Sequence, residues 1–277
     1  MIFQRVKRIY IQFRIFCLLL LDWLTRKKGI SITFNGLKLK IPGRYYRYFT
    51  EEYEKDNFLF LKEKVNPGFI CIDIGAHIGI YTVYMAKLSN ASVFSFEPTP
   101  SSVKTLRKMV AINHCEDTVT ILPAAVAERT GKTSFYLNNS VVSGSDDARV
   151  AEANSLVYVD FGKTINKEKI EVNTVSIDDF AEINNLKIHF IKMDAEGAEL
   201  DILKGAGKTI LAHRPSGIIS VHCFAFTDKE QTLADIWQIV SDYKLIPLFH
   251  NEEMTELQFL SMSKTDIFDF QFTPRLT

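Results

Sequence analysis

The chain has 277 residues, of which 47% are hydrophobic and 24% are charged, proportions that suit a folded globular domain and exclude a mainly disordered chain. The formal net charge is zero, yet residues 1–66 carry 14 Lys and Arg against 6 Asp and Glu. This positive excess lies at the N-terminus and away from the motifs described below, which argues against a nucleic-acid partner and leaves an anionic membrane surface or an acidic partner open.

Residues 2–24 are predicted to form an amphipathic helix. Its apolar face consists of Ile2, Val6, Ile9, Phe13, Phe16 and Leu20. Basic residues flank this face on both sides: Arg5, Lys7, Arg8 and Arg14. The longest uninterrupted apolar run, residues 15–21, is far shorter than the roughly 20 residues that a membrane span requires, and no signal-peptidase site follows it. Two alternatives stay open: the helix lies in the membrane interface, or it packs on the protein core or on a second subunit.

Residues 1–65 are predicted to form this helix and a small α/β extension, and residues 66–277 a single larger domain. Residues 30–42 alternate polar and apolar side chains around Asn35-Gly36, which predicts a hairpin. The second half of residues 44–65 is predicted to be helical. The cysteines, which form no C-x-x-C pair, are predicted to be buried thiols in a reducing compartment: Cys17, Cys71, Cys115 and Cys223. A cytoplasmic location is therefore expected, with peripheral contact at the inner face of the cytoplasmic membrane as an option.

Strands and helices alternate over residues 69–245, which predicts βαβ units and a doubly wound, mostly parallel sheet. The predicted strands cover residues 69–74, 92–96, 118–122, 188–193 and 217–224. The predicted helices cover residues 81–88, 101–113 and 233–243, and residues 199–204 are predicted to open a further helix. Residues 138–168 are rich in Ser, Asn, Gly and Asp and are predicted to form either an excursion over the mouth of a site or a partly mobile loop. Two short strands are predicted near residues 246–249 and 258–261.

A glycine loop with the sequence Asp73-Ile-Gly75-Ala76-His-Ile-Gly79 follows the first of these strands. Glycines let backbone N–H groups approach a ligand closely. The G-x-x-x-G spacing lacks the third glycine of dinucleotide-binding loops, which argues against a nicotinamide-dependent oxidoreductase. Glu97 ends the next strand, where a carboxylate can accept hydrogen bonds from both hydroxyls of a ribose. Together the two motifs predict a site for an adenosine ligand such as S-adenosylmethionine (SAM).

Acidic side chains and a histidine follow the later strands. Asp194 and Glu196 lie in the string Lys192-Met-Asp194-Ala-Glu196-Gly197-Ala-Glu199, and Glu199 is predicted only to complement the start of the next helix. His222 lies in the predicted strand at residues 217–224. His222 or Asp194 is predicted to act as a general base, with Glu196 orienting the substrate and Asp194 also a candidate for binding the cofactor ammonium. Lys192 and His77 are weaker candidates. Two carboxylates are too few to predict a metal site, so none is predicted.

Three strings resemble the FkbM-type methyltransferase family: "FICIDIGAHIGIYTVYMAK", "VFSFEPTPSSVKTLRKMVAIN" and "IHFIKMDAEGAELDILKGA". The resemblance covers roughly residues 65–250. It implies a class I SAM-methyltransferase (Rossmann-like) fold with a seven-stranded sheet and one antiparallel edge strand, and methyl transfer, usually to oxygen.

The resemblance also assigns roles to residues. It implies that Asp73, Gly75, Ala76 and Gly79 form the methionine-binding loop, that Glu97 binds the ribose, and that Ala125 borders the adenine. Residues 154–156 resemble a short family string. Ser220 departs from the family, in which many relatives have Glu at this position. The expected acceptor is a small molecule or a glycan, most simply a sugar hydroxyl. An inactive SAM-binding or membrane-associated scaffold and a homo-oligomer are further alternatives.

Overall fold

The structure is a computed structural model. It describes residues 13, 16–25, 28–46, 48–140, 165–248, 252–263 and 267–275. The family string at residues 154–156 and most of the predicted excursion lie outside these ranges.

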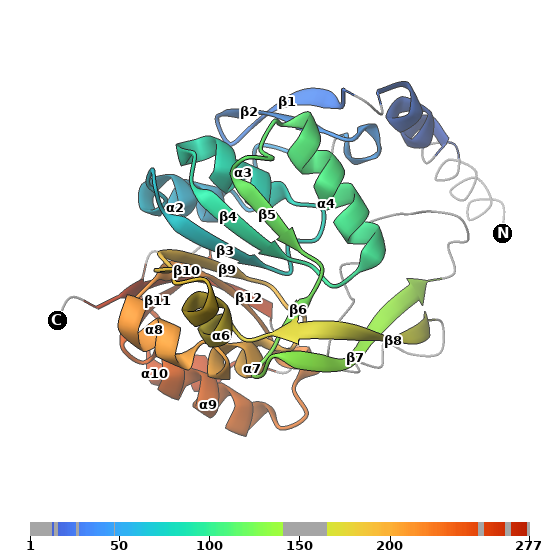
Figure 1. The fold of residues 1–277 in the computed structure, drawn as a ribbon. Helices are drawn as coiled ribbons and strands as arrows, with labels where there is room; N and C mark the ends of the chain where they lie inside the picture. Colours follow the sequence, from blue (N-terminus) through green and yellow to red (C-terminus); the bar gives the residue numbers. More distant parts are fainter. Residues whose placement is uncertain are drawn as a thin grey trace.

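A seven-stranded sheet forms the centre of the molecule (Figure 1), with the order β11-β12-β10-β9-β3-β4-β5. Its strands are β3 (Ile70–Ile74), β4 (Ser92–Phe96), β5 (Val119–Leu122), β9 (Phe190–Met193), β10 (Ser216–His222), β11 (Tyr243–Pro247) and β12 (Ile267–Pro274). Only β12 runs antiparallel to its neighbours within this sheet. The predicted mostly parallel sheet is confirmed, but the antiparallel strand was wrongly expected at the edge. It lies between β10 and β11, because β11 pairs with its outer side.

Helices cover both faces of this sheet (Figure 1). One face packs against α2 (Lys55–Lys64), α3 (Ile80–Ser89) and α4 (Pro100–Ile112). The other packs against α6 (Ile177–Ile183), α7 (Glu199–Lys204), α8 (Gly207–His213), α9 (Lys229–Val240) and α10 (Glu256–Leu260). Side chains alternate between the two faces of a strand, so Cys71 enters the first core and Ile72 the second. Burial on both faces explains why these parallel strands are nearly all apolar in sequence.

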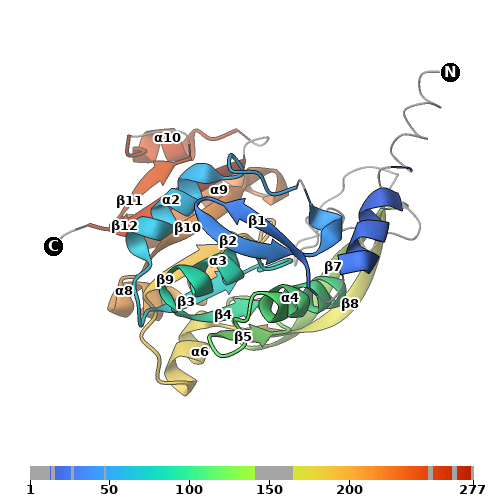
Figure 2. The ribbon, with the colours of Figure 1, turned by 90° about the horizontal axis from the view of Figure 1, so that it is seen from above.

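The N-terminal part packs over α3 and α4 (Figure 2). The predicted hairpin is present as β1 (Ile30–Phe34) and β2 (Leu37–Ile41), and a short 3-10 turn, η1 (Gly43–Tyr45), follows it. Asn35 and Gly36 both have positive φ, at 43° and 77°, as the tight hairpin turn requires. Residues on both sides of the predicted boundary at 65/66 belong to one core cluster. Phe34 and Phe58 lie before the boundary, and Tyr84 lies after it. The boundary itself stays a prediction.

Residues 16–25 are helical, and one side of this helix is anchored to the rest of the chain. Buried Asp22 lies 3.0 Å from Arg44 Nη2 and 2.9 Å from Lys108 Nζ. The described part of the predicted apolar face points away from the protein. Phe13, Phe16 and Leu20 are 65%, 61% and 44% exposed, so this face does not pack on the core of its own chain. Cys17 is exposed as well, contrary to its predicted burial.

A second sheet of three strands projects beside the main one (Figure 1). It contains β6 (Ala125–Val126), β7 (Gly131–Ser140) and β8 (Ile165–Val175), in the order β6-β8-β7. The ends of the predicted excursion, residues 138–140 and 165–168, therefore belong to paired strands. Their polar composition conceals this pairing, because backbone hydrogen bonds hold them together without an apolar stripe.

One predicted strand is wrong. Residues 258–261 overlap α10, whose start is fixed by a capping box between Thr255 and Gln258. Each side chain of the box bonds to a backbone N–H at the start of the helix, which satisfies donors that a helix leaves unpaired. The last strand of the chain is instead β12, which the sequence analysis did not predict.

Candidate active site

The carboxyl ends of β3, β4, β9 and β10 open into one cavity of about 380 Å³. Seven predicted site residues line it, the weaker candidate His77 included: Gly75, His77, Glu97, Ala125, Asp194, Glu196 and His222. This volume is large enough for a small ligand, and the position is where doubly wound sheets bind theirs. Residues far apart in the sequence therefore converge as expected.

The glycine turn after β3 sits directly against the end of β9. Gly75 has φ 71°, and a Cβ atom built on it would lie 1.8 Å from the carbonyl oxygen of Asp194. A side chain cannot occupy this position, so the two strand ends can approach each other only with glycine here. The N–H groups of Gly75 and Ala76 both donate to Phe96 O, which ties this turn to the end of β4.

Asp73, Ala76 and Gly79 do not line the cavity. Asp73 lies on the same side of β3 as Cys71, facing α3, and is fully buried, and its Oδ2 accepts a hydrogen bond from Thr82 Oγ1 at 2.5 Å. Gly79 instead allows close packing of the helix start, since a Cβ there would lie 2.3 Å from Leu106 Cδ1. These positions support the shape of the loop, and their predicted contact with a ligand stays a prediction.

Glu97 is held rigidly at the end of β4. Its two carboxylate oxygens accept backbone hydrogen bonds from His77 N and Thr99 N, each at 2.8 Å. Burial raises the pKa of Glu97, against the opposing effect of these two donors. The side chain is 5% exposed, and it lines the cavity. A carboxylate with both oxygens oriented in this way can accept ligand hydroxyl groups through its remaining lone pairs.

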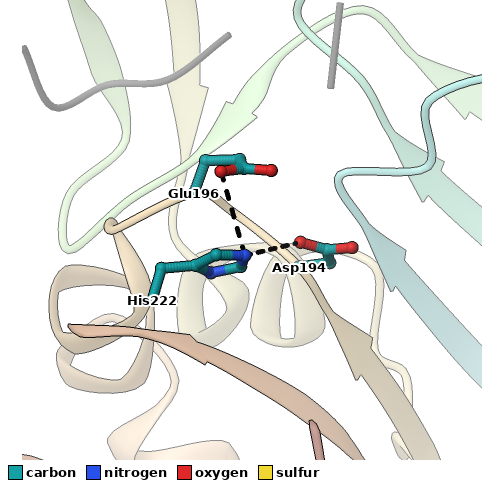
Figure 3. Close-up of side chains that lie close together, drawn as sticks. All are labelled: Asp194, Glu196 and His222. Atoms are coloured by element: carbon teal, nitrogen blue, oxygen red, sulfur yellow. Dashed lines mark ion pairs between the residues drawn. The ribbon is translucent and has the colours of Figure 1, made fainter. Parts of the chain in front are cut away.

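Asp194, Glu196 and His222 form a cluster in the cavity wall at the ends of β9 and β10 (Figure 3). His222 Nε2 lies 3.6 Å from Asp194 Oδ1 and 3.8 Å from Glu196 Oε2. Glu196 has φ 52° and Gly197 φ 104°, so the chain after β9 turns through the left-handed region. This turn brings the Glu196 carboxylate over the imidazole.

Glu199 fixes the imidazole of His222 through Nδ1, the ring nitrogen that does not face Asp194 and Glu196. His222 Nδ1 donates a hydrogen bond to Glu199 Oε1 at 2.7 Å, and the same oxygen accepts one from Gly197 N at 2.9 Å. The Glu199 side chain is completely buried. Its predicted role at the helix start is therefore incomplete, since the carboxylate also orients His222. Burial disfavours the charged imidazole, but Glu199, Asp194 and Glu196 outweigh this effect and raise the pKa of His222 to about 9.

Lys192 and the residues around it carry much of the site's charge. Lys192 is buried, and its Nζ donates to Asp194 Oδ2 at 3.2 Å and lies 4.9 Å from the centre of the Tyr81 ring. Burial lowers the pKa of this ammonium, but the carboxylates of Asp194, Asp73 and Glu54 outweigh burial and raise it. Lys192 is therefore a fixed cation and a poor general base.

Two further carboxylates line the cavity and were missed by the sequence analysis. Glu54 accepts a hydrogen bond from Tyr81 OH, and Asp269 accepts one from Ser220 Oγ at 2.6 Å. A carboxylate thus does reach Ser220, but from β12. The alternation of Phe268, Phe270 and Phe272 with polar residues would have predicted this strand. No comparable signal marks Glu54, which lies in a turn before α2.

The model of the methyltransferase FkbM domain matches residues 73–245, a range that contains the glycine turn, Glu97 and the whole cluster. The chain belongs to the methyltransferase FkbM domain family. The resemblance found in the three sequence strings is thereby confirmed, and the doubly wound sheet agrees with it.

Curated relatives of this FkbM-domain chain are distant. It is 28% identical over 142 residues to "Methyltransferase 1" of Beauveria bassiana, covering 48% of this chain and 57% of that protein. It is 24% identical over 193 residues to the hexuronic acid methyltransferase AglP of Haloferax volcanii, covering 69% of this chain and 70% of that protein. It is 27% identical over 163 residues to the 2-O-methyltransferase NoeI of Sinorhizobium fredii, covering 56% and 63%. The match thus spans little more than half of the first of these relatives.

The methyl donor that family membership implies is SAM, and the cavity has the features that this molecule needs. Gly75 leaves a cradle that a Cβ atom would fill, and Glu97 presents an oriented carboxylate for ribose hydroxyls. Ala125, on β6, adds a small apolar wall of the kind that an adenine ring can lie against. The residues present therefore fit the donor.

Proposed function

We propose that this FkbM-domain protein transfers the methyl group of SAM to a hydroxyl oxygen of a sugar or of a related glycan acceptor. The observation that carries the proposal is the convergence of Gly75, Glu97 and the Asp194–Glu196–His222 cluster on one cavity. When bound, SAM supplies an electrophilic methyl group on its sulfonium.

Residues on the β3 and β4 side of the cavity hold the donor in this proposal. Glu97 accepts hydrogen bonds from the ribose, the turn at Gly75 brings backbone close to the methionine part, and Ala125 borders the adenine. Asp194, after β9, would hold the donor's ammonium. A donor held by these residues would be fixed in one orientation, and such positioning supplies a large share of the rate enhancement.

In this proposal the Asp194–Glu196–His222 cluster orients and deprotonates the acceptor. Its hydroxyl must lose a proton as the new C–O bond forms, and His222 or Asp194 accepts that proton while Glu196 orients the sugar. The carboxylates of Glu199, Asp194 and Glu196 raise the pKa of His222, and the positive charge of a bound SAM would oppose them. Both candidate bases lie on rigid strand ends, as a catalytic group requires.

A sugar acceptor is supported by the names of two relatives, one a hexuronic acid methyltransferase and the other a 2-O-methyltransferase. Several hydrogen-bonding side chains line the cavity, as recognition of a polyhydroxylated ligand requires; they include Glu54, Ser220 and Asp269.

Methyl transfer from radiolabelled SAM to a panel of uronic acids and glycans tests this proposal. We expect labelled product from at least one sugar. We also expect at least one of Asp194→Asn and His222→Gln, the one that removes the base, to lower kcat/KM by at least about 100-fold, since a positioned general base contributes roughly 10²–10⁴-fold. Binding of S-adenosylhomocysteine without transfer to any acceptor would favour the inactive-scaffold alternative. Absence of both would contradict the proposal.

We also propose that the exposed helix at residues 16–25 lies on an anionic membrane surface at the cytoplasmic side, close to lipid-linked glycans. Phe13, Phe16 and Trp23 are 65%, 61% and 61% exposed, and the N-terminal segment is strongly basic. Aromatic side chains and basic flanks suit an interface in which rings enter the headgroup region. Among the described residues, no helix is long and apolar enough to cross a bilayer.

Flotation with vesicles containing phosphatidylserine tests this membrane contact. We expect the full chain to float and a variant without residues 1–27 to stay in solution. Equal partitioning of the two would contradict membrane contact. Sedimentation of the full chain as a dimer that the deletion abolishes would assign the helix to a second subunit instead.

A further inference from the structure

The Asp194–Glu196–His222 cluster combines two carboxylates and a histidine at one point of the cavity wall. The sequence alone offers two nearby carboxylates, which are too few for a metal site. The fold adds a third group, because His222 arrives from β10, beside β9. One ligand atom from each of the three residues lies within 4.8 Å of the others.

The distances within the cluster do not correspond to direct hydrogen bonds. His222 Nε2 is 3.6 Å from one carboxylate oxygen and 3.8 Å from the other, beyond the usual hydrogen-bond range. Ligand atoms that share one divalent cation at 2.0–2.6 Å lie about 3–3.7 Å apart. The three groups face a common point (Figure 3) and need only small rotations to share an ion.

An independent observation comes from the far side of the imidazole. His222 has only 6% of its side chain exposed, and its Nδ1 is fixed by fully buried Glu199 at 2.7 Å. Histidines that bind metals almost always donate their second N–H in this way, because the partner fixes the tautomer and the ring orientation. Glu199 therefore directs a buried nitrogen, Nε2, at the two carboxylates.

The charges in this region also favour a cation. Three carboxylates, those of Asp194, Glu196 and Glu199, surround one imidazole. Lys192 neutralises only the Oδ2 side of Asp194, and Asp194 Oδ1 faces His222. Asp194 and Glu196 are 40% and 24% exposed, so an ion could enter from the cavity.

We propose that Asp194, Glu196 and His222 bind one divalent cation whose remaining coordination positions face the cavity. A mixed oxygen and nitrogen set suits Mn²⁺ and related ions. The cation site stands on the geometry of the cluster alone. The further statement that an acceptor oxygen occupies an open position rests on the proposed function. With the cation bound, both nitrogens of His222 are engaged, so Asp194 is then the remaining candidate for the general base.

The site can be tested without donor or acceptor by titrating the untagged full chain with Mn²⁺. The electron paramagnetic resonance signal of the free ion measures how much Mn²⁺ is bound. We expect one Mn²⁺ per chain. Affinity should fall at least tenfold in Glu196→Gln and in His222→Gln. Pulsed spectra should show coupling to a nitrogen nucleus in the wild type and not in His222→Gln. Asp201→Asn, which changes an exposed carboxylate on α7 outside the cluster, should bind Mn²⁺ as the wild type does.

Binding of S-adenosylhomocysteine by the same samples separates the possible failures. Glu196→Gln carries little folding risk, because Glu196 lies in a partly exposed loop, and retained S-adenosylhomocysteine binding shows that a variant is folded. A wild-type chain that binds S-adenosylhomocysteine but not Mn²⁺ overturns the cation site and leaves the proposed function standing. The same conclusion follows if both cluster variants bind Mn²⁺ as tightly as the wild type. A chain that binds Mn²⁺ but not S-adenosylhomocysteine supports the site and overturns the proposed function.

Discussion

Lys192 is a buried ammonium that compensates the charge of several strand-end carboxylates. Asp73 is fully buried beside it, and burial raises the pKa of Asp73 while Lys192 opposes that rise. Removal of one partner from a buried charged group leaves the others uncompensated.

We expect Lys192→Met to lower the free energy of unfolding by about 3–5 kcal/mol, measured by urea denaturation. Lys132→Met is the matched control, because Lys132 pairs with Glu171 on the exposed surface, and should change stability little. Similar, small effects of the two substitutions would show that Lys192 does not hold this network together.

Gly75 is constrained both by its positive φ and by the adjacent backbone of Asp194. We expect Gly75→Ala to lower the free energy of unfolding by more than about 2 kcal/mol and to abolish S-adenosylhomocysteine binding, since the strand ends must separate. Calorimetry measures both quantities. Gly207→Ala, where no atom lies within 4 Å of an added Cβ, should leave binding unchanged. Retained binding by Gly75→Ala would contradict the close approach of the two strand ends.

Asp22 is a buried anchor of the helix at residues 16–25. Burial raises the pKa of Asp22, but Lys108 and Arg44 outweigh burial, and the net pKa lies below its ordinary value of 3.8. Because the pKa is lower in the folded state, the stabilisation is fully present above the unfolded-state pKa and is lost as the pH falls through the folded-state pKa.

We therefore expect Asp22→Asn to expose residues 16–25 to proteolysis at pH 7, with a loss of stability of about 1–3 kcal/mol. The difference between wild type and variant should shrink as the pH falls below 3.8. A difference independent of pH would assign the effect to something other than the ionised carboxylate.

The capping box between Thr255 and Gln258 stabilises the start of α10. Thr255→Ala removes the acceptor for Gln258 N and should destabilise the chain by about 1 kcal/mol in thermal unfolding. Thr255→Ser keeps the hydroxyl and should restore most of this loss. If Thr255→Ala and Thr255→Ser had the same stability, the capping role of the hydroxyl would be contradicted.

The elements that the sequence predicted well are those with strong local patterns. Apolar runs identify β3 and β9, and the turn pair Asn35-Gly36 identifies the hairpin. Among the elements that were missed, β7 and β8 are polar and are held by pairing with each other. The strand β12 does carry a local alternation of Phe and polar residues, but its place between β10 and β11 depends on long-range contacts. The same limit applies to the site. Strand-end position predicted Glu97 and Asp194, whereas Glu54 and Asp269 reach the cavity only through tertiary packing.

At the scale of the whole molecule, the proposed function assigns donor binding and acceptor binding to two different sides of one cavity. The β3 and β4 side presents the glycine turn and Glu97, and the β9 and β10 side presents the cluster with His222. The sheet holds both sides rigidly because each residue sits at or next to a strand end. Donor and acceptor can therefore meet within one cavity without large movement of the fold.

Calorimetric titration of the full chain with S-adenosylhomocysteine tests this central claim most directly, with Glu97→Gln beside the exposed control Glu116→Gln. The account predicts one binding site in the wild type and in Glu116→Gln, and at least about tenfold weaker binding in Glu97→Gln, since a hydrogen bond to a charged group contributes roughly 1.5–3 kcal/mol. A wild-type chain that does not bind the ligand, or a Glu97→Gln variant that binds it unchanged, would contradict the account.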